Sequence, residues 1–207
     1  MATAQLRKAD KKNTYHHGDL RTALMKAALA LIDQHGIKGF SLKDAAALAG
    51  VSTAAPYRHF ADKAALLFAL KNEGFRLFNA ALTEGYARGA ESEGGPARRI
   101  VELGVAYVAF ALHNPAHFRV MFGLVGGVNP EPDPEQSDGF LLLVKAVDEL
   151  VPNLSPEERK DRVLASWSLV HGFALLQLEG VFAATLPIEN VEQQLRRTLA
   201  VIAEPHS

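Results

Sequence analysis

The sequence predicts an all-α protein with two helical domains. Apolar residues recur at helical spacing along most of the chain, and no stretch alternates like a strand. Ser, Asp, Gly and Pro residues mark the expected helix ends. With 207 residues, of which 48% are hydrophobic, the chain is long enough for one large domain or two small ones with a substantial core.

The charges are divided unevenly along the chain. Through Lys71 there are 11 Lys and Arg residues against 5 Asp and Glu, and the remainder holds 11 against 18. A basic N-terminal part joined to an acidic C-terminal part favours nucleic-acid binding at one end only. A chance asymmetry is the alternative interpretation.

Composition also excludes several classes of protein. The chain has no cysteine, which rules out disulfides, thiolate metal sites and a Cys nucleophile. The N-terminus has no apolar run typical of a signal peptide. Charges or glycines interrupt the apolar stretches before they reach membrane-spanning length. We therefore expect a soluble, cytoplasmic protein without membrane association.

The first elements are an arm and a bracing helix. Residues 1–14 are polar and basic, and they predict a flexible arm that either attracts phosphates or is simply solvated. Asp19 is a plausible N-cap for a helix from Leu20 to about His35, which Gly36 ends. One face of this helix is apolar, so it should pack behind the next two helices.

Residues 41–63 predict two short helices joined by a sharp turn. Ser41 can cap the first helix, Gly50 can end it in a left-handed conformation, and Val51 can fill the corner from inside. Ser52 can cap the second helix. A glycine-containing turn between two short helices is typical of a helix-turn-helix.

The second of these helices is expected to run to about Phe60. Its exposed face would carry short or cationic side chains, as a helix in a DNA major groove requires. Pro56 removes a backbone hydrogen bond within it and biases Ala55 away from helical geometry.

The rest of the chain predicts further helices separated by loops. Loops are expected at Glu91–Pro96 and at 123–139, the second being Gly- and Pro-rich and acting as a mobile loop or a lid. Gly74 lowers helix propensity and could allow a bend. The expected helices cover residues 64–88, 97–113, 116–122, 140–150, 155–184 and 187–203.

The helix-turn-helix carries a specific resemblance. Ala49-Gly50-Val51-Ser52, then Tyr57-Arg58-His59-Phe60, then Asp62-Lys63, resembles the DNA-binding domain of the TetR family of bacterial transcriptional regulators. The match spans about residues 15–70. Pro56 departs from the family pattern, where an aliphatic residue is usual, and Ala47 and Leu48 stand where polar residues are commoner.

This resemblance implies a DNA-binding domain at 15–63 and a ligand-binding and dimerisation domain at 64–207. It also implies a homodimer formed through the helices at about 155–184 and 187–203. By the same resemblance Lys43, Thr53, Ala54, Ala55 and Arg58 would face bases or phosphates, and Tyr57, His59 and Lys63 would hold the DNA backbone. The eight expected DNA-binding residues are Lys43, Thr53, Ala54, Ala55, Tyr57, Arg58, His59 and Lys63.

A second, shorter motif lies near the C-terminus. Residues 167–173 resemble a Trp-x-x-x-His-Gly signature found in one C-terminal subgroup of the family. Trp167 and His171 share a helix face. Either they stack and line a pocket, or they pack the core or a dimer interface around Gly172. The candidate pocket residues are Phe110, His113, Phe118, Met121, Phe122, Trp167 and His171.

The histidines do not indicate a metal site. Adjacent His16 and His17 point in different directions, and Asn114-Pro115 breaks the helix between His113 and His117. We expect no metal and no cofactor.

The expected function is a homodimeric, ligand-responsive transcriptional regulator, more often a repressor than an activator in this family. It would bind a palindromic operator and be released by a small-molecule inducer. An activator or an inducer-independent DNA binder of the same fold is the alternative. A small helical enzyme is a remote one, because the sequence has no phosphate loop, no metal-spaced cluster and no recognisable nucleophile–base arrangement.

Overall fold

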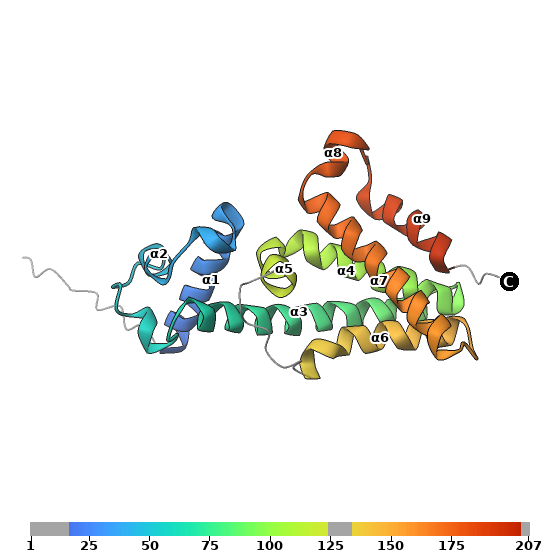
Figure 1. Ribbon diagram of the computed structural model, residues 1–207, viewed down its shortest axis with the longest axis horizontal. Helices are drawn as coiled ribbons and strands as arrows, with labels where there is room; N and C mark the ends of the chain where they lie inside the picture. Colours follow the sequence, from blue (N-terminus) through green and yellow to red (C-terminus); the bar gives the residue numbers. More distant parts are fainter. Residues whose placement is uncertain (1–16, 124–133, 204–207) are drawn as a thin grey trace, which may run out of the picture.

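A computed structural model describes residues 17–123 and 134–203, and this part of the chain is all-α, as predicted (Figure 1). Short 3-10 turns separate the first α-helices. The elements in chain order are α1 (His17–His35), η1 (Ile37–Gly39), α2 (Leu42–Leu48), η2 (Pro56–Arg58), α3 (Lys63–Glu91), α4 (Gly95–His113), α5 (Pro115–Phe122), α6 (Pro134–Leu150), α7 (Pro156–Leu178), α8 (Val181–Thr185) and α9 (Val191–Ala203).

The long helix α3 forms the axis of the molecule. Figure 1 shows α1 and α2 at its N-terminal end, and α4, α6, α7 and α9 around the remainder. The start of α3 packs into an N-terminal core with α1 and α2, through Leu66, Leu67 and Leu70. Its later turns pack into a C-terminal core with the helices that follow, through Phe78 and Leu82.

The small helix α5 contributes to both cores. Ala116 and Val120 belong to the N-terminal core, whereas Phe118 and Met121 belong to the C-terminal core. The helix packs closely on α3 at Gly74, where an added Cβ would lie 2.7 Å from the Met121 sulfur. A larger residue at this position would therefore force the Met121 side chain to move.

An ion pair and a hydrogen bond also hold α5 in place. Arg119 Nη1 lies 3.0 Å from Asp33 Oδ1 of α1, and His117 Nε2 lies 3.2 Å from Glu73 Oε2 of α3. The helix is therefore fastened by side chains to an element of each core.

The expected caps around the first motif helix are present. Ser41 and Asp44 form a reciprocal capping box at α2, and Gly50 adopts a φ of 70° just beyond its end. Val51 is half-buried against the N-terminal core. The Asp62 carboxylate accepts a hydrogen bond of 2.8 Å from the Ala65 amide at the start of α3.

Some predicted helix bounds are wrong at the N-terminal side. The helix α1 includes His17, so Asp19 lies inside it and is not its N-cap. The helix α6 begins at Pro134, six residues before the predicted start. Residues 134–139 of the predicted 123–139 loop are thus helical, and 124–133 lie outside the described residues.

The C-terminal helices also differ from the prediction. The predicted helix at 155–184 is divided into α7 and α8, because Gly180 adopts a φ of 70° between them. The last helix begins at Val191 and not at Pro187. The Asn190 side chain accepts a hydrogen bond from the Gln193 amide at 2.9 Å and so caps this start.

A buried carboxylate fastens α9 to the C-terminal core. Glu102 of α4 is 3% exposed. Its oxygens lie 2.6 Å from Arg196 Nη1 of α9 and 2.9 Å from Arg98 Nη2. Burial alone would raise the pKa of Glu102, but the arginine hydrogen bonds and charges lower it.

We predict that Glu102→Gln lowers the free energy of unfolding by about 1–3 kcal/mol, because it removes charged hydrogen bonds to partly exposed arginines. The matched control is Glu192→Gln, which removes the exposed partner of the same Arg196 and should cost less than about 0.5 kcal/mol. Chemical denaturation at one protein concentration measures both. Equal costs for the two variants would contradict this role of Glu102.

Candidate DNA interface and ligand cavity

The segment predicted as the second motif helix is a series of tight turns. Within the described residues, the 3-10 turn η2 is the only helical element of this segment. Pro56 has no amide hydrogen, so the Ser52 carbonyl accepts from the Ala55 amide instead, at 3.0 Å. The Pro56 carbonyl then accepts from both His59 and Phe60 amides, each at 2.9 Å.

Two local expectations about this segment are wrong. The N-cap of η2 is Ala55 and not Ser52. Ala55 has φ and ψ of −63° and −40°, which is helical geometry. The steric preference of the residue before proline is a bias, and here the tight turn overrides it.

Most of the predicted DNA-binding side chains lie at the surface of this N-terminal unit, at the end of the molecule opposite α9 (Figure 1). Ala55, His59 and Lys63 are half-buried. The exposed members of the set are Lys43, Thr53, Ala54, Tyr57 and Arg58. Their contacts with DNA remain predictions.

Lys63 has a partner inside the protein. Its Nζ donates to the Phe40 carbonyl at 2.6 Å and lies 4.3 Å from the centre of the Phe40 ring. Burial lowers the pKa of Lys63. The side chain therefore fastens the start of α3 to the segment before α2, in addition to its predicted phosphate contact.

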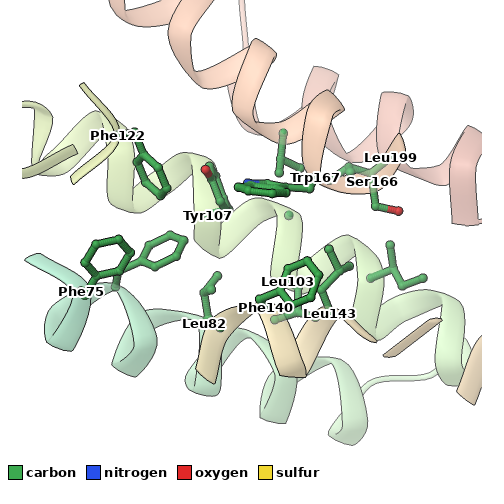
Figure 2. Close-up of a pocket in the computed structure, with 15 residues that line it drawn as sticks. Phe75, Leu82, Leu103, Tyr107, Phe122, Phe140, Leu143, Ser166, Trp167 and Leu199 are labelled. Carbon is green, nitrogen blue, oxygen red and sulfur yellow. The ribbon is translucent and has the colours of Figure 1, made fainter. Parts of the chain in front are cut away.

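The C-terminal domain contains an apolar cavity of about 330 Å³. Figure 2 shows side chains from α3, α4, α6, α7 and α9 directed into it, with Phe122 at one end. Its size is near the lower end of the range for small-molecule sites, ~300–1,000 Å³.

Two of the seven predicted pocket residues, Phe122 and Trp167, line this cavity. Phe118 and His171 line a neighbouring groove of about 740 Å³, between α7 and the N-terminal unit, which Phe122 and Lys63 also reach. Ligand contacts of these residues remain predictions.

The other three predicted pocket residues lie elsewhere. Phe110 is buried and packs edge to face on Phe78, with ring centres 5.2 Å apart. Met121 packs against Gly74. His113 is exposed, and its Nδ1 lies 2.7 Å from the Ala109 carbonyl. Helical spacing did not separate cavity-facing side chains from core-facing ones.

Tyr107 is the functional candidate that sequence reasoning missed. Its hydroxyl lies 2.8 Å from His171 Nδ1, and it donates to that nitrogen when His171 is the neutral Nε2–H tautomer. Figure 2 shows the Trp167 indole nitrogen directed towards the same hydroxyl, and this contact opposes the rise in the Tyr107 pKa that burial causes. Trp167 and His171 are thus joined through Tyr107 and are not a stacked pair. A lone Tyr in an apolar helix gave no sequence signal of this bridge.

Ring contacts surround the bridge on both sides. His171 packs against Phe118 and Phe122, with ring centres 5.5 Å and 5.1 Å apart. Trp167 packs edge to face on Phe140 of α6, with ring centres 6.0 Å apart, and both residues line the cavity. The Trp-x-x-x-His-Gly residues therefore separate the cavity from the groove beside the N-terminal unit.

Metal and membrane sites are not indicated by the described residues. No group of three or more His, Asp or Glu side chains within 17–123 and 134–203 could hold a metal ion. None of the helices described there is long and apolar enough to cross a membrane.

Comparison with known proteins places this architecture in a family. A family model described as "Bacterial regulatory proteins, tetR family" matches residues 24–70. One described as "Tetracyclin repressor-like, C-terminal domain" matches residues 100–202. The chain belongs to the TetR family of bacterial transcriptional regulators, and it is a regulator and not an enzyme. No curated protein matches it.

Solved structures share the fold. A protein with unknown function from Rhodococcus sp. RHA1 is 29% identical, with a TM-score of 0.74, over 93% of this chain and 97% of that one. A regulatory protein in the tetR family from Rhodococcus RHA1 is 18% identical, with a TM-score of 0.69, over 88% and 94%. A TetR variant from Acinetobacter baumannii AYE, in complex with minocycline, is 18% identical, with a TM-score of 0.58, over 92% and 95%.

The bridge predicts a pH dependence of stability. Burial lowers the pKa of His171 from its ordinary value of 6.5, so the unfolded chain binds this proton more readily than the folded chain. The contribution of His171 to stability is complete above the unfolded-state pKa and is lost as the pH falls below it. Denaturation midpoints measured across this range should fall less steeply for His171→Gln than for the parent protein. Parallel pH profiles of the variant and the parent protein would contradict a lowered pKa of His171.

Proposed function

We propose that this protein is a homodimeric repressor that binds a palindromic operator and is released when a small molecule occupies the C-terminal cavity. The observation that carries the proposal is the position of the cavity. Phe122 of α5 lines it, and the same short helix contributes Ala116 and Val120 to the core of the N-terminal unit. A change in the cavity can therefore alter the placement of the DNA-binding side chains.

The physical requirement on such an inducer is differential affinity. A ligand shifts the equilibrium between two arrangements only if it binds one of them more tightly. Filling the cavity would press on Phe122. The Arg119–Asp33 ion pair and the close contact at Gly74 would transmit that displacement to α1 and α3.

Exposed apolar side chains support a dimer. They gather on α7, α8 and α9, the region predicted to pair. An added Cβ at Gly172 of α7 would meet no atom within 4 Å, so a second helix has room to approach. The exposed apolar residues of these helices, with Leu186 directly after α8, are Leu164, Trp167, Leu175, Leu176, Val181, Leu186 and Val201.

Selection from a randomised duplex library at physiological salt tests operator binding. A sequence-specific dimer enriches a palindrome, with half-sites about one helical turn apart on straight DNA. Binding without enrichment that disappears as salt rises would identify a non-specific phosphate binder and contradict the proposal.

Two substitutions separate backbone contacts from base contacts. Tyr57→Phe should weaken binding about equally for all duplexes, because it removes a hydroxyl expected to reach phosphate. Thr53→Ala should change the preferred base at particular positions. Arg76→Ala, which removes an exposed charge near the middle of α3, is the control and should leave both the affinity and the base preference unchanged. Unchanged affinity for Tyr57→Phe, or an unchanged base preference for Thr53→Ala, would refute the corresponding assignment.

The dimer interface is tested by adding a charge to it. Leu176→Glu places a carboxylate on the proposed interface of α7 and should give monomers in sedimentation velocity, with weaker operator binding. Leu141→Glu makes the same change at an exposed position of α6 and should leave the dimer intact. Dimers that survive Leu176→Glu unchanged would place the interface elsewhere.

A further inference from the structure

The chemical character of the cavity wall limits what it can bind. Fifteen described residues line the cavity, and none of them carries a charge. The nearest buried carboxylate, Glu102, is already paired with Arg98 and Arg196. An ionised ligand would therefore lose its hydration without gaining a counter-ion.

The composition of the cavity wall favours a ligand that is mostly hydrocarbon. Six of the lining residues are aromatic and most of the others are aliphatic. Burial of apolar surface is thus the main source of affinity that the cavity offers.

The Tyr107 hydroxyl supplies a defined polar point. With His171 as the Nε2–H tautomer, the hydroxyl proton is donated to His171 Nδ1, and the Trp167 indole nitrogen is directed towards the oxygen (Figure 2). The oxygen retains one further lone pair, so it can accept a hydrogen bond but has no second proton to donate. A ligand group that only accepts hydrogen bonds would find no donor there.

We infer that the effector is an uncharged, predominantly hydrocarbon alcohol or phenol, whose hydroxyl donates to Tyr107. The inference deepens the proposed function, since it takes the cavity as the effector site. Carboxylates and ammonium ions of the same length are excluded by the uncharged wall, and ethers bind more weakly because they have no proton to donate.

Four probes of matched length separate the effect of ligand charge from the effect of a hydrogen-bond donor. They are 1-decanol, its isomer 1-methoxynonane, decanoate and decylammonium. Trp167 is the only tryptophan of the chain and lines the cavity, so its fluorescence reports occupancy on the protein alone. At neutral pH, decanol should bind at least about tenfold more tightly than either ion. It should bind about 2- to 10-fold more tightly than the ether.

Two variants test the two parts of the inference separately. Tyr107→Phe should abolish the preference for the alcohol over the ether while leaving the ions excluded. Leu143→Lys places a cation in the half-buried rim of the cavity on α6 and should improve decanoate binding relative to decanol. Leu141→Lys, on the exposed side of the same helix, is the matched control and should change neither. Thermal melting confirms that each variant is folded.

Two outcomes would overturn the inference. One is an ion binding as tightly as decanol to the parent protein, and the other is no fluorescence response to any of the four probes. Failure of the proposed function is a separate result, because operator selection is carried out without a ligand. A protein that selects a palindrome but binds none of the probes refutes the effector class and leaves the DNA-binding proposal standing.

Discussion

The structure depends on one continuous helix that belongs to two cores. The first turns of α3 are buried with α1 and α2, and its later turns line the cavity through Phe75, Phe78 and Leu82. Bending a regular helix between these regions would cost backbone hydrogen bonds. The DNA-binding unit and the cavity are therefore connected by one continuous helix, which in the proposed function would carry a displacement from one to the other.

The helix α5 provides a second connection between the N-terminal unit and the cavity. Gly74 admits Met121 close to the α3 backbone, and Arg119 pairs with Asp33 of α1. At its end, Phe122 reaches both the cavity and the groove beside Lys63. A displacement of this aromatic ring thus has a direct steric route to the side of α1 and α3 that supports the DNA-binding segment.

Local chemistry explains which parts of the fold could be predicted from the sequence. Ser41, Gly50 and Ser155 act through neighbouring backbone groups, so their patterns predicted helix ends correctly. The break at Gly180 was missed, because an apolar pattern continues on both sides of it. The tight turns around Pro56 were only partly predicted. The sequence shows that Pro56 lacks an amide hydrogen, but it does not show which backbone amides and carbonyls pair around it.

The cavity was harder to predict for a different reason. Helical periodicity identifies a buried face, but it does not show whether the opposing helix fills the space. Phe110 and Phe122 look alike in sequence, and only one of them meets empty volume. The role of Tyr107 depends on a contact with His171, 64 positions away in the chain. Such a pairing is set by tertiary packing alone.

The most direct test of the account measures whether filling the cavity moves the DNA-binding units. The chain has no cysteine, so Leu48→Cys on the exposed face of α2 gives one spin-label site per protomer. Double electron–electron resonance then measures the label-to-label distance in the proposed dimer. The account predicts that saturation of the cavity with 1-decanol, followed by Trp167 fluorescence, shifts this distance distribution and that Phe122→Ala reduces the shift. An unchanged distribution with the cavity fully occupied would contradict it.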